Sequence, residues 1–205
     1  SLVKVPLIVA ATVGAWYALT PPQPPPGAKE RVNSGGVERS FGSVVRVHAF
    51  IWKLLACVLV ETSFLSHLPP PFLRTSTVLP LPLPLRAIAL HPAFVLGCLM
   101  TAASGALRLA CYKTLGSLFT FELTLREDHR LVTSGPYAFV RHPSYSGVVL
   151  GVVGTLLVHF GPGSWWVRAG WLNTIVGQAY AVCWCAMETY VLSSILLRTP
   201  TEDAF

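Results

Sequence analysis

Long apolar runs separated by polar or proline-rich segments dominate the sequence. Five runs approach the roughly 20 residues that cross a bilayer core, namely residues 2–20, 44–65, 87–107, 143–160 and 169–197. The second run is the weakest, because it carries Arg46, Lys53 and Glu61. The fifth is longer than the hydrocarbon core at 1.5 Å per residue, so we expect its C-terminal end to leave the membrane. The pattern predicts an all-α, polytopic integral membrane protein with about five transmembrane helices.

Two proline-rich connectors, residues 21–36 and 68–85, join the first three runs. Proline does not fit a helix interior, and the second connector is apolar enough to lie along the membrane surface. Nothing divides the chain further, which predicts one membrane-embedded domain over residues 1–205. Because Lys4 precedes an apolar stretch, a signal peptide is an alternative for the first run.

The composition supports a membrane protein: 53% of residues are hydrophobic and 12% are charged, about half the charge of a soluble domain. The lysines and arginines are scattered without interleaved aromatics, so we expect no nucleic-acid partner. The five cysteines lie in or beside apolar runs, which predicts buried thiols at positions 57, 98, 111, 183 and 185. Cys183 and Cys185 point to different faces of a helix, so we expect no metal site.

Charge asymmetry predicts the orientation. The second and fourth loops hold only Arg74, Arg86 and Arg168, whereas nine basic residues occupy the first and third, namely Lys29, Arg31, Arg39, Arg46, Arg108, Lys113, Arg126, Arg130 and Arg141. The positive-inside rule therefore places residues 108–142 and the C-terminal end in the cytosol, and the N-terminus outside.

The polar side chains gather in residues 112–142. Residues 118–125 are predicted to be extended, residues 134–136 to form a turn, and Pro143 to begin a helix whose N-terminus favours an anionic group. His142 is either an orienting residue at the membrane interface or a ligand contact, and His129 is either a solvated loop residue or part of the same site. Their nearness to Tyr137 and Tyr145 favours a site.

Two helical faces consist of small residues, one at Gly147, Gly151 and Gly154, the other at positions 97, 101 and 104. Such faces indicate either tight helix packing or an entrance for a long apolar substrate. If the last two runs form a hairpin through residues 161–168, Arg198 and Glu202 return to the side of His142. An ordinary charged flank of the last helix is the alternative.

The segments "HRLVTSGPYAFVRHPSYSG" and "RTPTED" resemble the isoprenylcysteine carboxyl methyltransferase family of membrane enzymes. The resemblance covers about residues 105–205, the expected catalytic region, and "TFEL" at 120–123 is similar to fungal-type members. The RHP-x-Y portion is also similar to phospholipid methyltransferases and, more loosely, to sterol reductases. The family's amphipathic C-terminal tail does not follow Phe205, so we expect a truncated chain.

The resemblance implies S-adenosyl-L-methionine as methyl donor and prenylated CaaX proteins as acceptors, at the endoplasmic reticulum with the active site facing the cytosol. Arg198 falls on the position expected to hold the substrate carboxylate. The donor-contacting positions fall on Glu122, His129, Arg130, Leu131, Val132, Tyr137, His142, Pro143, Ser144, Tyr145 and Glu202. Glu122 stands where other members have Gln, which sets it apart from the rest.

Two other functions remain open at this point. A phospholipid N-methyltransferase would share the cofactor loop but has less reason for an arginine facing the acceptor. A non-catalytic helical membrane protein or a transporter would instead use Lys53, Glu61 and Glu188 as an intramembrane relay.

Overall fold

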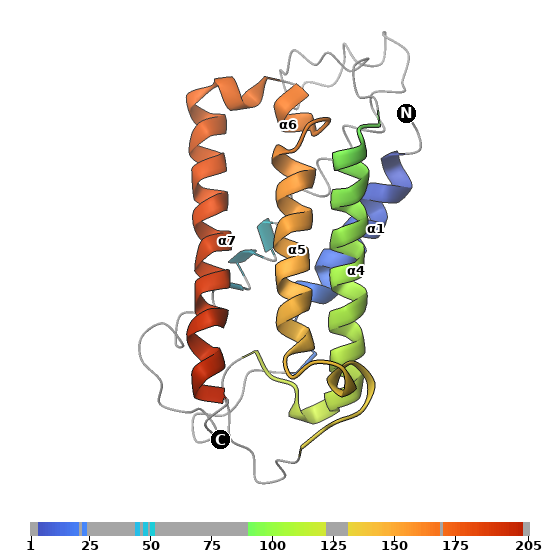
Figure 1. The fold of residues 1–205 in the computed structure, drawn as a ribbon. Coiled ribbons are helices and arrows are strands. Elements are labelled where there is room, and N and C mark those ends of the chain that lie inside the picture. Colours follow the sequence, from blue (N-terminus) through green and yellow to red (C-terminus); the bar gives the residue numbers. More distant parts are fainter. Residues whose placement is uncertain are drawn as a thin grey trace.

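The computed structural model describes residues 4–20, 22–23, 44–45, 47–48, 50–51, 90–121, 131–168 and 170–202, with the backbone alone for residues 165 and 198–202. Every regular element among them is helical (Figure 1). The long helices are α1 (Lys4–Leu19), α4 (Pro92–Leu115), α5 (Pro143–Phe160) and α7 (Ile175–Glu202). The short ones are η2 (Gly116–Leu118), η3 (Gly135–Ala138), α6 (Trp165–Arg168) and η4 (Trp171–Asn173).

Three of the expected spans are confirmed as helices long and apolar enough to cross a membrane, namely Pro92–Leu118, Pro143–Phe160 and Ile175–Leu197. The first run forms the shorter apolar helix α1, with 16 residues. Most of the run at 44–65 lies outside the described residues. The all-helical prediction holds for the described part of the chain.

The helix ends follow local capping signals. α5 has the expected bounds, because Pro143 occupies its first turn and Gly161 follows its last. The end expected for the third run at residue 107 was wrong, because α4 continues to Leu115 and stops at Gly116 with φ +55°. The start expected for the fifth run at residue 169 was also wrong, because Thr174 caps α7 by accepting from the Gly177 amide at 3.1 Å.

The two small-residue faces pack against each other, so tight helix packing is confirmed for them. A Cβ added at Gly97 would lie 2.9 Å from the Gly154 carbonyl oxygen, and one at Gly154 would lie 2.7 Å from the Thr101 amide nitrogen. Ser104 donates to the Gly147 carbonyl at 2.6 Å. The alternative of a substrate entrance between α4 and α5 is therefore wrong, because backbone meets backbone there.

α7 contacts the bundle along one narrow stripe. Its buried residues recur at helical spacing, at Gly177, Trp184, Glu188, Val191, Ser194 and Ile195. Cys98 and Cys111 are buried as predicted, but the prediction was wrong for Cys183 and Cys185, which are exposed. Much of the rest of the helix circumference is exposed, and both cysteines lie on that part.

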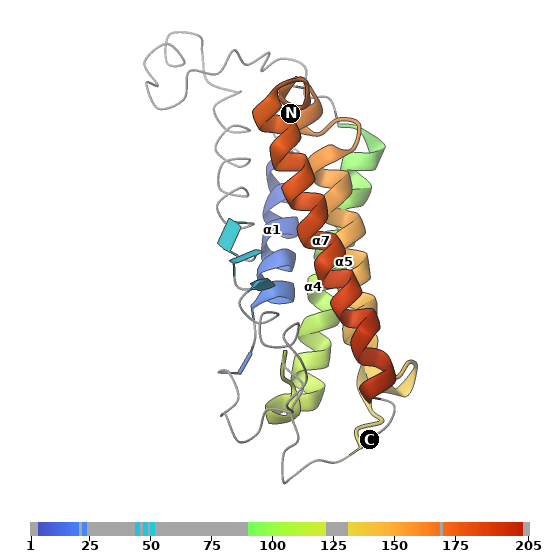
Figure 2. The same ribbon diagram turned by 90° about the vertical axis from the view of Figure 1, so that its left-hand side faces the viewer.

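The last two long helices form the expected hairpin. α5 lies between α7 and α4, and the start of α1 and the end of α7 lie at opposite ends of the bundle (Figure 1). The view turned by 90° shows α7 in front of α5 (Figure 2), and Ala15 of α1 belongs to the same buried cluster as Trp184 of α7. The first turn of α5 and the last turn of α7 consequently lie at one end of the bundle (Figure 1).

Candidate functional site

The first turn of α5 carries the central residues of the predicted site. The His142 carbonyl accepts from the amides of Tyr145 at 3.0 Å and Ser146 at 3.3 Å, so His142 is the residue that begins the helix. Its imidazole stacks on the Tyr145 ring with a centroid separation of 5.3 Å and an interplanar angle of 13°. Both rings are partly exposed, whereas Pro143 and Ser144 are buried. The turn thus offers flat aromatic faces beside the positive end of a helix.

Residues 131–141 lead into this turn from the surface. Leu131 is 90% exposed, and Val132 is partly exposed. The predicted turn at residues 134–136 is confirmed, and Gly135 adopts φ +58°, a conformation that side chains rarely tolerate. The short helix η3 that follows directs Tyr137 back towards α4.

Tyr137 packs on an aromatic cluster at the end of α4, formed with Cys111, Tyr112 and Phe119. The Tyr112 and Phe119 rings lie 4.3 Å apart between centroids. Burial raises the pKa of the Tyr137 phenol, and the neighbouring Cys111 thiol raises it further. Tyr137 is therefore a neutral phenol in the physiological pH range, with a hydroxyl that can donate a hydrogen bond.

Arg108 is a site residue that sequence reasoning missed, since it was counted only as a loop charge. It lies within α4 and is 6% exposed. Its Nη1 donates to the carbonyl oxygen of Ser144 at 3.3 Å and to the Ser144 hydroxyl at 3.2 Å. The signal for it was present in the spacing, because Arg108 and Tyr112 are four residues apart and share one helix face.

The C-terminal end of α7 supplies the second polar group of the prediction. The helix continues through Glu202, so Arg198 and Glu202 are one turn apart in its last two turns. These positions lie at the same end of the bundle as the first turn of α5 (Figure 1). The expected return of the last helix to this end of the bundle is thus confirmed for the backbone, while the side chains of both residues lie outside the description.

Several residues of the sequence-based hypotheses fall outside the described residues, among them Cys57, which was predicted to be a buried thiol.

Five others belong to the predicted site and relay. They are the predicted donor contacts Glu122, His129 and Arg130 and the relay candidates Lys53 and Glu61. Phe121, immediately before the first of them, packs on the aromatic cluster at the end of α4.

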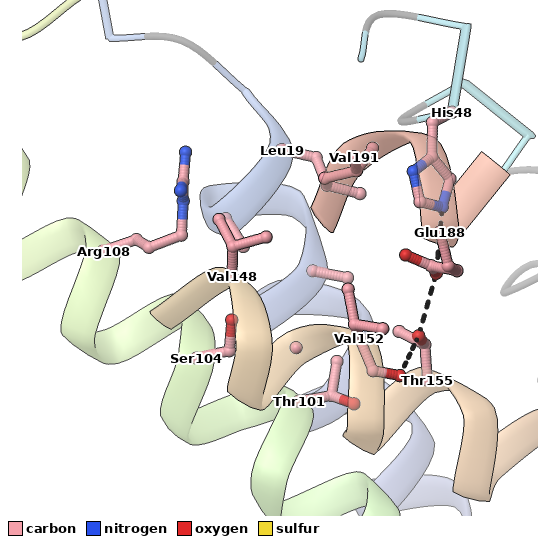
Figure 3. Close-up of a pocket in the computed structure, with 13 residues that line it drawn as sticks. Leu19, His48, Thr101, Ser104, Arg108, Val148, Val152, Thr155, Glu188 and Val191 are labelled. Atoms are coloured by element: carbon pink, nitrogen blue, oxygen red, sulfur yellow. Dashed lines mark hydrogen bonds and ion pairs between the residues drawn. The ribbon is translucent and has the colours of Figure 1, made fainter. Parts of the chain in front are cut away.

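A small cavity lies in the middle of the bundle, between α1, α4, α5, α7 and His48 (Figure 3). Arg108 lies on one side of it and Glu188 on the other (Figure 3). The Thr155 hydroxyl donates to Glu188 Oε1 at 3.1 Å, and His48 Nε2 lies 3.3 Å from the same oxygen. Glu188 therefore ties α7 to α5 and to the segment around residue 48.

The volume of this cavity limits what it can hold. It measures about 40 Å³, which is room for a few water molecules and far below the several hundred Å³ of a typical ligand pocket. Its lining is mostly aliphatic apart from the polar groups already described. We therefore assign the cavity to the interior of the bundle and place the candidate site at the end of the helices, around His142 and Tyr145.

Comparison with known proteins gives similarity over this same region. Residues 95–175 match the family model described as isoprenylcysteine carboxyl methyltransferase (ICMT) family. Over 68 residues the chain is 40% identical to protein-S-isoprenylcysteine O-methyltransferase B and 37% identical to protein-S-isoprenylcysteine O-methyltransferase A, both from Arabidopsis thaliana. The aligned part is 32% of this chain and 34% of each relative, so the chain spans about a third of the length of the curated relatives it matches. No solved structure matches.

The matched region contains α4, the turn at residues 135–145 and α5. The family match therefore covers the turn at His142 and Tyr145, whereas the end of α7, with Arg198 and Glu202, lies outside it. Both relatives are plant proteins, and nothing in these comparisons supports the resemblance to fungal-type members.

Proposed function

We propose that this chain transfers a methyl group from S-adenosylmethionine to the C-terminal carboxylate of a prenylated cysteine. One observation carries the proposal. The region similar to isoprenylcysteine carboxyl methyltransferases, residues 95–175, contains the turn at His142, and the hairpin of α5 and α7 brings that turn to the same end as Arg198 and Glu202 (Figure 1). The cytosolic side and the endoplasmic reticulum belong to this proposal as well.

The residues at the first turn of α5 fit such a donor. A sulfonium cation and an adenine ring both associate favourably with aromatic faces, and the stacked rings of His142 and Tyr145 present such faces partly exposed. The amino-acid carboxylate of the donor suits the positive end of a helix. Tyr137, whose side chain packs on the end of α4, is proposed as a further donor contact nearby.

Other residues complete the proposed donor site. Leu131 and Val132 contribute through their backbone, Pro143 and Ser144 through the shape of the turn, and Glu202 by accepting from the amino group of the donor. Glu122, His129 and Arg130 are proposed to close the same pocket. The Ser144 hydroxyl itself faces Arg108, so its part is to hold the turn in place.

The chemistry requires alignment more than activation. The donor supplies a methyl group on a positively charged sulfur, and a carboxylate is already a nucleophile at neutral pH. The reaction forms a bond between a carboxylate oxygen and the methyl carbon and breaks the carbon–sulfur bond, whose electron pair stays on sulfur. The protein therefore has to bring the two groups together and exclude water.

Arg198 is proposed to position the acceptor. A guanidinium can hold a carboxylate by two parallel hydrogen bonds, which fixes the direction of the attacking oxygen. The prenyl chain stays in the bilayer and cannot pass between α4 and α5, which are in backbone contact. We propose that it approaches along α7, where Leu196 and Leu197 are 71% and 67% exposed at the same end.

A paired-substrate assay tests the proposed function. Purified full-length protein should transfer labelled methyl from S-adenosylmethionine to a farnesylated cysteine analogue, and transfer to phosphatidylethanolamine should be at background level. The acceptor separates the two classes of membrane methyltransferase, because both would use the same donor loop. Methylation of phosphatidylethanolamine without methylation of the prenylcysteine would contradict the proposal.

His142→Ala should weaken donor binding by about tenfold, because it removes one of the two stacked faces and a group at the start of α5. Binding of S-adenosylhomocysteine to the full-length protein, measured by calorimetry, gives this value directly. Ser146→Ala, an exposed position one turn further along α5, serves as the control and should bind as the wild type does. Equal affinities in all three proteins would place the donor elsewhere.

A further inference from the structure

Arg108 is a charge inside a candidate membrane span. It lies within Pro92–Leu118 and is 6% exposed. A buried guanidinium is expensive in a bilayer unless its donors are satisfied, and charged groups at such positions are usually functional. The proposed chemistry at His142 and Arg198 does not by itself account for Arg108.

Its hydrogen bonds join three helices at one level. Nε donates to the Tyr112 hydroxyl at 3.0 Å, and Nη1 donates to both oxygens of Ser144 on α5. The Tyr112 hydroxyl in turn donates to the Ala18 carbonyl on α1 at 3.0 Å. The guanidinium therefore connects α4 with the beginning of α5 and, through Tyr112, with the end of α1.

Aromatic rings and a glycine make room for this arrangement. Arg108 Cζ lies 4.9 Å from the Phe121 ring centroid and 5.5 Å from that of Tyr112, within the range of cation–π attraction. A Cβ added at Gly147 would lie 2.8 Å from Arg108 Cγ. Gly147 thus admits the arginine stem between α4 and α5, while the rings hold the planar head group in one orientation.

The residue that Arg108 holds is at the centre of the proposed donor site. Ser144 lies between Pro143 and Tyr145 in the first turn of α5. Nη1 binds its carbonyl oxygen as well as its hydroxyl, so the backbone of the turn is fixed along with the side chain. A shift of this turn by about 1 Å would misplace the stacked rings, and displacements of that size can cost about 100-fold in rate.

We infer that Arg108 is a positioning residue for the donor, which holds the first turn of α5 from inside the bundle. The inference rests on the proposed function, because it takes the ligand of that turn to be S-adenosylmethionine. It predicts that donor affinity depends on Arg108, although the residue acts through Ser144 and its guanidinium is directed into the bundle.

The test compares Arg108→Met with Lys113→Met in full-length protein. Both variants remove one positive charge from α4, but Lys113 is exposed in its last turn. Arg108→Met should weaken S-adenosylhomocysteine binding and raise the KM for S-adenosylmethionine at least tenfold, with the KM for the prenylcysteine within about twofold. Lys113→Met should change none of these values beyond about twofold.

Two further variants separate positioning from simple stabilisation. Arg108→Lys keeps the charge, but its side chain cannot reach Tyr112 and Ser144 together. Compared with Arg108→Met, it should restore the melting temperature of the protein. It should restore less than half of the donor-binding free energy that Arg108→Met loses. Tyr112→Phe, a milder change, should weaken donor binding about threefold in the wild type and have no effect in Arg108→Met, because the two residues share one network.

Two kinds of result would overturn the inference. In the first, Arg108→Met melts at a lower temperature but binds the donor as the wild type does. Arg108 would then stabilise the helix bundle without positioning the donor. A wild type that binds no donor would overturn the proposed function and this inference together. A wild type that binds the donor but methylates only a phospholipid contradicts the proposed acceptor, and the affinity series then decides on Arg108 independently.

Discussion

Gly154→Val should lower the free energy of unfolding by about 3 kcal/mol, at the upper end of what overpacking a close contact costs. A Cβ at position 154 would lie 2.5 Å from Thr101 Oγ1 and 2.7 Å from the Thr101 amide nitrogen. The second of these atoms belongs to the backbone of α4, so α4 and α5 would have to move apart. Unfolding in detergent micelles, followed by the helical circular dichroism signal, measures the loss.

Two control variants make this expectation specific. Gly154→Ala should cost about 1–2 kcal/mol, because it adds the same Cβ without the branches. Val153→Leu adds a methylene at the neighbouring position, which is 40% exposed, and should change stability by no more than about 0.5 kcal/mol. A Gly154→Val protein as stable as the wild type would mean that the two helices are not in backbone contact.

Local signals were sufficient where an element depends on its own residues. The bounds of α5 follow from Pro143 at its start and Gly161 at its end, and both signals could be identified in the sequence. The turn at Gly135 follows from its Ser-Gly-Pro sequence in the same way. Elements of this kind need no information about distant partners.

The end of α4 depended on partners that a sequence does not reveal. A charged residue after an apolar run normally marks the end of a span, and Arg108 was interpreted in that way. It stays inside the helix because Ser144, 36 positions away, and Tyr112 supply its acceptors. The burial of His48 was also not predictable from nearby residues, since its partner Glu188 is on a helix 140 positions further along.

In the candidate site, too, some features were predictable from the sequence and others were not. The hairpin of α5 and α7 was predictable from two apolar runs and a short connection, and it brings residue 202 to the end where residue 142 lies (Figure 1). The meaning of the small-residue faces was not predictable, because tight packing and a lipid entrance need the same small side chains. The close contacts between α4 and α5, such as that between Gly97 and Gly154, distinguish them.

Arg198→Ala should reduce methyl transfer to a prenylcysteine by about 100-fold in kcat/KM, the size expected when an acceptor loses its alignment. Binding of S-adenosylhomocysteine should stay within about twofold of the wild type, because the proposed donor contacts lie within residues 122–145 and at Glu202 and do not include Arg198. Steady-state kinetics with a farnesylated cysteine analogue and calorimetry on the same full-length protein measure the two quantities.

Arg168→Ala is the matched control, since Arg168 is an exposed arginine in α6 at the opposite end of the α5–α7 hairpin. It should leave both quantities unchanged. Arg198→Lys keeps the charge but not the two parallel hydrogen bonds, so it should recover only part of the lost rate. Equal losses of donor binding and of methyl transfer in Arg198→Ala would move this residue into the donor pocket. In that case another group at this end of the bundle would have to align the carboxylate.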